Sequence, residues 1–73
     1  MELTFRMKLK DLLERKGISQ KELAKATGLR EATISELVND TRSAYNKKHL
    51  LTIMEALKVT DLSEVLEVIV LKK

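Results

Sequence analysis

The sequence of 73 residues contains no cysteine. Disulfides and cysteine-based zinc sites are therefore excluded as sources of stability, and the absence of thiols fits a reducing compartment. A chain of this length forms one domain and buries roughly 60% of the surface that its unfolded form exposes. Its stability must then come from helix packing, with oligomerisation as a further source.

Long apolar runs are also missing. The sequence has no apolar stretch of about 18 residues, the length that a membrane span needs, and no apolar segment behind a basic N-terminus. We therefore expect neither a membrane span nor a signal peptide, and we predict a cytoplasmic protein.

Residue sets for catalysis or metal binding are absent too. His49 is the single histidine, and no cysteine accompanies it as a second metal ligand. The sequence shows no Ser-His-Asp set and no glycine-rich phosphate loop. We therefore do not expect an enzyme, a metal site or a cofactor, and we place His49 at the surface or at its boundary.

The charge is unevenly distributed, although the net charge is only +3. Residues 1–40 carry eight basic and seven acidic side chains, which gives +1. Residues 41–58 carry four basic side chains and one acidic, which gives +3, and residues 59–73 carry two and three, which gives −1. The positive excess therefore follows residue 40, where it favours contact with an anionic partner.

Residues 18–39 carry the clearest local pattern. Ser19 and Glu22 have the spacing of a capping box, in which each side chain accepts a hydrogen bond from the other residue's backbone N–H. A helix should therefore begin at Gln20, and Gly28 should end it, because glycine adopts the left-handed conformation without steric cost. Helical spacing predicts a second helix from about Arg30 through Ile34, Leu37 and Val38.

Small and apolar residues further specify how the two helices meet. Ile18 and Leu23 have the spacing of a hydrophobic staple, which fixes the angle at which the chain enters the first helix. Ala24 is small enough to let Ile34 of the second helix approach closely. The pattern therefore predicts two short helices that are joined by a tight turn.

The segment SQKELAKATGLREATISEL, residues 19–37, resembles the helix-turn-helix of the phage Cro/repressor (Xre) family. Gln20 opens the first helix, Ala24 and Gly28 have the spacing of that motif, and residues 33–35 lie inside the second helix. The resemblance extends over nearly the whole chain. It implies an all-α, five-helix, lambda-repressor-like DNA-binding domain over residues 1–73, with the motif at 19–38.

Secondary structure is also predicted on both sides of the motif. Residues 2–6 alternate in polarity and indicate a short strand. A helix is expected from Met7 to Gly17, with its apolar face formed by Leu9, Leu12 and Leu13. Asn46 is a favourable N-cap for the next helix, whose apolar stripe comprises Leu50, Ile53, Met54 and Leu57.

Two features near the end of the chain are less regular. Leu51 falls outside the apolar stripe and is either an isolated surface residue or a contact for a partner. Thr60 is expected to cap a last short helix from Asp61 to about Leu66, with Asp61 and Glu64 near its positive end.

Residues 67–71 form the second predicted strand. Val68, Ile69, Val70 and Leu71 are consecutive apolar residues, which suits a strand covered on both faces. Its pairing partner is either the strand at 2–6 or the same strand of a second copy. One face is expected to meet the helical core and the other a symmetry mate, which predicts a homodimer. A frayed tail is the alternative.

The resemblance implies sequence-specific binding of double-stranded DNA by a bacterial or phage transcriptional regulator, with the helix at 30–38 in the major groove. Arg30 suits guanine or a phosphate, Ala32 a thymine methyl group, and Ser35 either a base or the backbone. A solvated charge is the alternative for Arg30. The outward positions of this helix are Arg30, Glu31, Ala32, Ser35 and Glu36, with Thr33 and Asn39 at its edges.

Contacts to the DNA backbone are expected around this helix. Gln20 and Lys21 lie at a helix N-terminus, which favours anions. The further candidates are Thr33, Asn39, Arg42, Asn46, Lys47 and Lys48. For the lysines the alternative is an ordinary solvated face, and Tyr45 is expected to pack over the base of the fourth helix.

Glu31 and Glu36 oppose binding to a polyanion unless each meets a cytosine amino group or an arginine. Together with the apolar run at 68–71, they support a second hypothesis. In that hypothesis the helix-turn-helix is the scaffold of a protein-interaction module, either antitoxin-like or regulator-binding.

Overall fold

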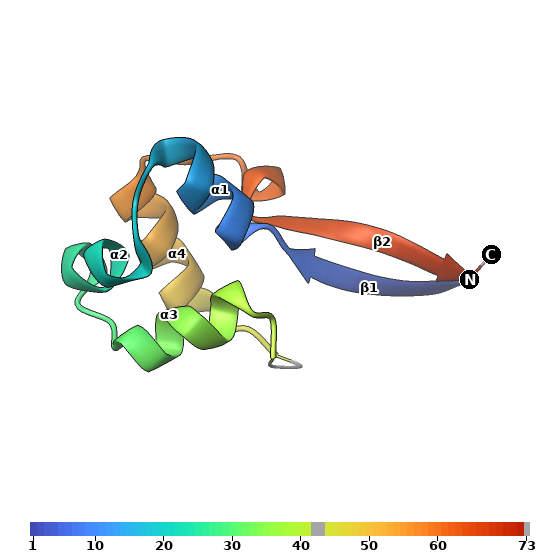
Figure 1. The fold of residues 1–73 in the computed structure, drawn as a ribbon. Coiled ribbons are helices and arrows are strands. Elements are labelled where there is room, and N and C mark those ends of the chain that lie inside the picture. The colour runs from blue at the N-terminus through green and yellow to red at the C-terminus, as the bar shows by residue number, and fades with distance from the viewer. Residues whose placement is uncertain (42–43, 73) are drawn as a thin grey trace.

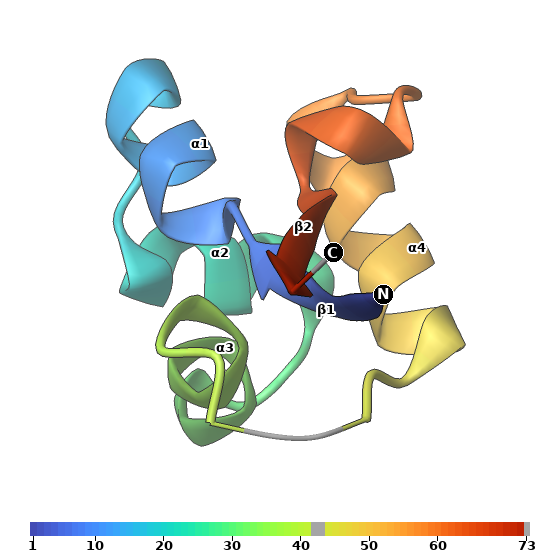
Figure 2. The same cartoon turned by 90° about the vertical axis from the view of Figure 1, so that its right-hand side faces the viewer.

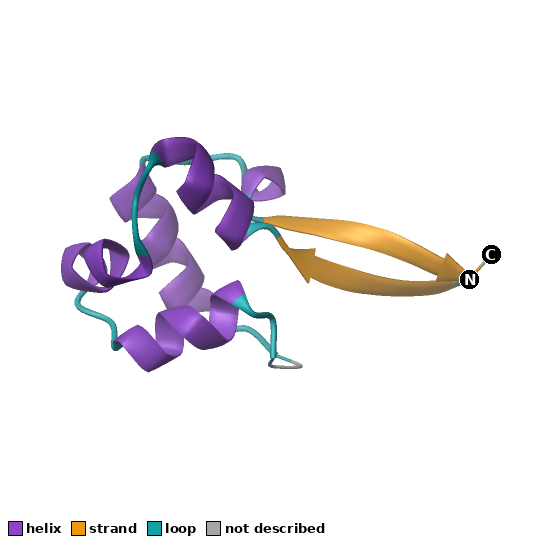
Figure 3. Ribbon diagram, viewed as in Figure 1, coloured by secondary structure: helices purple, strands orange, loops and turns teal. Residues whose placement is uncertain are grey.

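The computed structural model of the protein describes residues 1–41 and 44–72. Helices α1 (Leu9–Lys16), α2 (Gln20–Thr27), α3 (Glu31–Val38) and α4 (Lys47–Leu57) gather into one body (Figure 1). Strands β1 (Glu2–Met7) and β2 (Leu66–Lys72) extend from this body as an antiparallel pair (Figure 3). The ribbon makes the molecule about twice as long as it is wide, with extents of 41 × 21 × 20 Å.

Side-chain caps define where two helices begin. Ser19 Oγ accepts a hydrogen bond from the Glu22 amide at 3.0 Å, and Glu22 Oε1 accepts one from the Ser19 amide at 3.1 Å. This confirms the predicted capping box and the start of α2 at Gln20. Asn46 caps α4 as predicted, since its Oδ1 accepts from the His49 amide at 3.1 Å.

The turn between α2 and α3 is fixed by a glycine and a hydroxyl group. Gly28 adopts the left-handed conformation with φ of 76°, and its amide donates to the Ala24 carbonyl at 2.9 Å. The Thr27 hydroxyl donates to the Leu23 carbonyl at 2.8 Å and accepts from the Leu29 amide at 3.2 Å. Each of these bonds spans only a few residues, so the local sequence determines the turn.

One apolar cluster holds the four helices together. Ile34 of α3 and Ile53 of α4 are both 0% exposed, and Leu23 of α2 is 1% exposed. The predicted inward faces of the four helices are confirmed. Leu51 is 54% exposed, which agrees with either interpretation of this residue. The buried residues are Met7, Leu9, Leu12, Leu13, Leu23, Ala24, Ile34, Leu37, Val38, Ile53, Met54, Leu57, Val59 and Val65.

The predicted fifth helix is absent from the described residues. Instead of a helix over 61–66, the chain forms a short 3-10 turn, η1 (Leu62–Glu64). Asp61 caps this turn in place of Thr60, because its Oδ1 accepts from the Ser63 amide at 2.9 Å. The bonds from the Ser63 hydroxyl and amide hold the pKa of Asp61 below its usual value.

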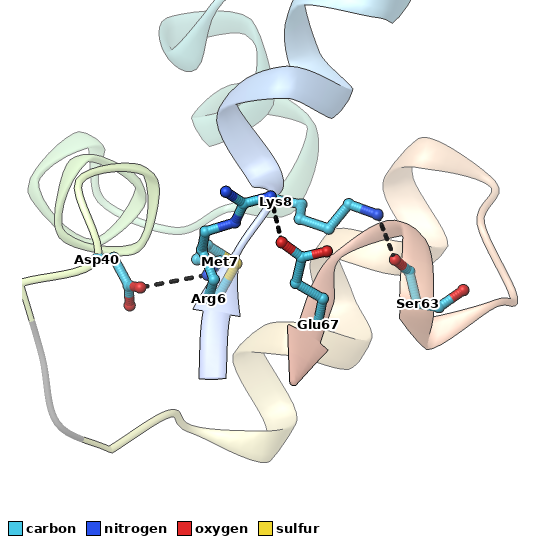
Figure 4. A network of polar contacts seen from close by, with 6 residues as sticks. All are labelled: Arg6, Met7, Lys8, Asp40, Ser63 and Glu67. Carbon is cyan, nitrogen blue, oxygen red and sulfur yellow. Dashed lines mark hydrogen bonds and ion pairs between the residues drawn. The ribbon is translucent and has the colours of Figure 1, made fainter. Parts of the chain in front are cut away.

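Contacts distant in sequence explain why a fifth helix does not form. The Val65 carbonyl accepts a hydrogen bond from the Lys8 amide at 2.6 Å, and Val65 is 0% exposed. Lys8 Nζ also donates to the Ser63 carbonyl at 2.8 Å (Figure 4). Leu66 then begins β2. The expectation of five helices is therefore wrong, and the fold has four α-helices and a two-stranded ribbon in its described residues.

The first helix also begins later than expected. Met7 is the last residue of β1 and belongs to the buried cluster, and α1 begins at Leu9. Gly17 ends α1 as predicted, in the left-handed conformation with φ of 68°. Met7 thus carries the strand into the core of the helical body.

The two strands pair within one chain, which agrees with the first of the two predicted pairings. Leu3 lies opposite Val70, and Met7 lies opposite Leu66. The ribbon projects from the helices, with α1 and α3 on one side and α4 on the other (Figure 2). The expectation that one face of the run Val68–Leu71 meets the helical core is therefore wrong, since none of these four residues packs against the core. Val68, Val70 and Leu71 are 59%, 46% and 63% exposed.

A carboxylate connects the ribbon to the end of α3. Asp40 follows α3 in the left-handed conformation with φ of 53°, which aspartate tolerates better than most residues. Its Oδ2 accepts from the Met7 amide at 3.2 Å (Figure 4), and its Oδ1 accepts from the Tyr45 hydroxyl at 2.6 Å. The Tyr45 ring packs edge-on against Phe5 with the centroids 6.5 Å apart. Tyr45 thus contacts β1 as well as the core.

The capping box makes a testable contribution to stability. Replacement of Ser19 by alanine leaves the Glu22 amide without its acceptor and is expected to lower the free energy of unfolding by about 1 kcal/mol. Urea denaturation followed by circular dichroism measures the change. Ser19→Asp retains an acceptor and should stay close to the wild type. Equal losses in both variants would contradict the assignment of the cap.

The bond between Tyr45 and Asp40 predicts a dependence on pH. Burial, followed by the hydrogen bond and the charge of Asp40, raises the pKa of Tyr45 to about 12. Because folding favours the neutral phenol, its stabilising effect is complete below pH 10 and is lost as the pH rises toward 12.

Tyr45→Phe should therefore lower the free energy of unfolding by about 1 kcal/mol at neutral pH. The difference from the wild type should shrink above pH 10, as measured by urea denaturation at several pH values. A difference that does not change with pH would show that the phenol does not titrate as described.

Candidate nucleic-acid interface

The solvent-facing residues of α3 and of its two flanking positions form the candidate nucleic-acid interface. Arg30, in extended conformation, is the N-cap residue, so the helix begins at Glu31, one residue later than expected. Ile34, Leu37 and Val38 are buried, which leaves the opposite face of α3 toward solvent. On this face Arg30, Glu31, Ala32 and Asn39 are exposed, and Thr33, Ser35 and Glu36 are half-buried.

A shallow hollow between α2 and the start of α3 gathers positive charge. Lys21, Lys25 and Arg30 line it, and the acidic Glu31 lines it as well. Lys25 is not among the predicted contacts, although its spacing of four residues from Lys21 places both side chains on one face of α2. The structure thus brings two predicted site residues, Lys21 and Arg30, next to a third cation.

A second hollow lies between α3 and the start of α4. Its lining includes Thr33 and Glu36 from α3, and Asn46 and His49 from the N-terminal end of α4. The Asn46 side-chain oxygen is already used in capping the helix. Lys47 and Lys48 are the first two residues of α4, and both are exposed. The start of α4 therefore lies beside α3 and carries two adjacent cations.

Two of the predicted contact residues, Gln20 and Asn39, differ from the other predicted residues in their surroundings. Gln20 is exposed but lines a hollow on the side of α1, together with Lys10 and with Val38 at the end of α3. Asn39 Nδ2 donates to Ser35 Oγ at 3.2 Å, so a contact of either side chain with DNA has to compete with this bond. Arg42 lies outside the described residues.

The arrangement suits a polyanion better than a small molecule. The N-termini of α2 and α4 carry the positive end of the helix dipole, and Ser19 and Asn46 each cap one backbone N–H group there. Both N-termini lie on helices of at least eight residues that flank α3.

Within residues 1–41 and 44–72, no three His, Cys, Asp or Glu side chains are grouped as a metal site. No helix in this part of the chain has the length and apolar character to cross a membrane.

Comparison with known proteins agrees with this geometry. A family model described as a Cro/C1-type HTH DNA-binding domain matches residues 8–70. No match was found among curated proteins or among solved structures. The matched segment contains all four helices and most of β2, and it excludes β1. The chain therefore belongs to the family of Cro/C1-type helix-turn-helix DNA-binding domains.

Proposed function

We propose that the protein is a bacterial or phage transcriptional regulator that binds a specific sequence of double-stranded DNA. One observation carries the proposal: the solvent-facing side of α3 is flanked by the cationic starts of α2 and α4. A major groove admits one α-helix, and the elements beside that helix then meet the two phosphate backbones. Family membership supports the same function.

Direct reading of bases is assigned to the N-terminal half of α3. Arg30 has a planar guanidinium group that matches the acceptors of guanine, and Ala32 offers a methyl group to thymine. Both side chains are exposed. Ser35 is the third candidate, although its hydroxyl already accepts a hydrogen bond from Asn39.

Phosphate contacts are assigned to the flanking residues. Lys21 and Lys25 lie on the α2 side of α3, and Lys47 and Lys48 lie on the α4 side. Cations are unfavourable at the start of a helix because of its dipole, and a phosphate nearby offsets this effect. The remaining backbone candidates are Gln20, Thr33, Asn39, Arg42 and Asn46.

The two carboxylates of α3 limit affinity and contribute to selectivity. Glu31 lies in the first turn, where it stabilises the positive end of the helix, and it shares a hollow with Arg30. A carboxylate in the major groove accepts a hydrogen bond from the amino group of cytosine. It repels base edges that present acceptor atoms, such as those of guanine. We therefore assign Glu31 and Glu36 to discrimination between sequences.

We propose that the domain acts in the cytoplasm and binds DNA as a homodimer. Two copies present two recognition helices to half-sites about one helical turn apart, which gives affinity that one helix of eight residues lacks. The terminal ribbon supplies a surface for the second copy through its exposed apolar residues, which include Leu3, Phe5, Val68 and Val70.

A protein-interaction module is the second candidate function, and the same ribbon favours it. Its exposed apolar side chains suit a protein partner, and the helix-turn-helix would then be a scaffold. Fluorescence anisotropy separates the two functions. A regulator binds one selected duplex more than about a thousandfold tighter than random duplexes, whereas a scaffold binds all of them equally weakly.

Replacement of Arg30 by alanine tests base readout. Loss of a bidentate contact should weaken binding to the selected duplex by a factor of about 5 to 150, with a much smaller effect on random duplexes. Arg15→Ala, at an exposed position of α1, removes the same charge as a matched control. Equal weakening on both kinds of duplex would show that Arg30 contacts phosphate instead of a base.

Replacement of Lys47 by alanine tests the phosphate contacts of α4. Affinity should fall on every duplex, and the slope of log K against log salt concentration should decrease in magnitude by about one. Lys16→Ala, at the exposed last position of α1, is the control and should leave the slope unchanged. An unchanged slope in Lys47→Ala would remove this residue from the interface.

A further inference from the structure

The strand register separates the ribbon into an apolar and a polar face. Residues that lie opposite each other in the two strands share a face. The polar face carries Thr4, Ile69 and the ion pair between Arg6 and Glu67 (Figure 4). The apolar face consists of three pairs, from the outer end to the base: Leu3 with Val70, Phe5 with Val68, and Met7 with Leu66.

The apolar face continues the hydrophobic core into solvent. At its base Met7 is 7% exposed and belongs to the core, and Leu66 packs against the core. Farther out, Leu3, Phe5 and Val68 are 57%, 58% and 59% exposed. The outer side chains together present on the order of 400 Å², a patch size that is often functional in soluble proteins. The helical body therefore buries the base of the apolar face and leaves its outer end exposed to solvent.

A hollow lies beside the base of the same face. Phe5, Leu66 and Val68 of the ribbon line it, together with Leu62 of η1. Leu62 is itself 53% exposed, and Ser63 and Glu67 are the polar members of the lining among the described residues. The face therefore combines a projecting apolar outer end with an apolar recess near its base.

We propose that the apolar face of the ribbon packs against the same face of a second copy around a two-fold axis. The outer pair Leu3 and Val70 of each copy then occupies the recess beside Leu62 of the other, and the middle pair lies near the axis. This inference deepens the proposed homodimer and is independent of whether the protein binds DNA.

The chemistry of the face favours a second copy. The six residues of the face carry no charge, so a charged partner finds no complement there. A projection and a recess on one surface are mutually complementary when a two-fold axis relates two copies, because each contact then occurs twice. The ion pair belongs to the polar face, and Glu67 also lines the recess.

Pairing of two ribbons edge to edge satisfies backbone groups but leaves the apolar faces in water. Face-to-face packing instead removes them from water at the usual sheet separation of about 10 Å. The two patches bury on the order of 800 Å² together, which is near the lower end for specific interfaces. We therefore expect a dimer that dissociates in the micromolar range, roughly 1–100 µM.

Cysteine cross-linking tests the geometry, because the chain has no native thiol. Val68→Cys places a thiol near the proposed axis, and mild oxidation should yield a covalent dimer on non-reducing gels. Ile69→Cys places the thiol on the opposite face of the same strand and should stay monomeric. Equal cross-linking of both variants would overturn the face-to-face arrangement.

Sedimentation equilibrium of the unmodified chain tests the association itself. Leu3→Lys adds a charge to the apolar face and should weaken the dimer at least tenfold, whereas Thr4→Lys, on the polar face, should leave it unchanged. Circular dichroism confirms that each variant is folded.

The outcomes separate the two proposals. A wild type that stays monomeric at about 200 µM, well above the expected dissociation range, would overturn the homodimer together with its proposed surface. A wild-type dimer that Leu3→Lys leaves intact would overturn the surface alone. DNA affinity, measured separately by anisotropy, tests the regulator function independently of both outcomes.

Discussion

The structure depends on one apolar cluster that all four helices share. Helices α1, α2 and α3 each contain eight residues, too few to be stable alone in water, and no disulfide supports them. Each helix therefore persists only while its buried face contacts the others. The orientation of α3 follows from this constraint, since burial of Ile34 and Leu37 turns its opposite side toward solvent. The core therefore determines which residues form the proposed recognition surface.

Asp40 adds a polar connection to this apolar framework. Its carboxylate lies at the end of α3 and binds both the last amide of β1 and the hydroxyl of Tyr45. The same residue takes up the left-handed conformation that lets the chain leave α3. The base of the ribbon is thereby hydrogen-bonded to the residue that follows the C-terminal end of α3 by two positions. This connection joins the surface proposed for a second copy to the surface proposed for DNA.

Local interactions made much of the fold predictable. The cap at Ser19, the turn at Gly28 and the helical apolar stripes each involve residues a few positions apart, and all were confirmed. The fifth helix was predicted wrongly because the backbone bond between Lys8 and Val65 joins opposite ends of the chain. The amphipathic pattern also predicted which side of α3 faces solvent, and burial of Ile34, Leu37 and Val38 confirms it, whereas the DNA contacts themselves stay a prediction. Lys25 was missed because the hollow that it lines appears only once α2 and α3 are packed together.

The ribbon joins the two ends of the chain, and this has a consequence for the order of folding. The helices and the turn between α2 and α3 form from contacts close in sequence, whereas β1 and β2 meet only after nearly the whole chain has been brought together. Closing so large a loop costs entropy that only a preformed helical body can offset. The strands should therefore pair after the transition state for folding. Substitutions in the ribbon would then mainly change how fast the protein unfolds, and those in the helical core would change how fast it folds.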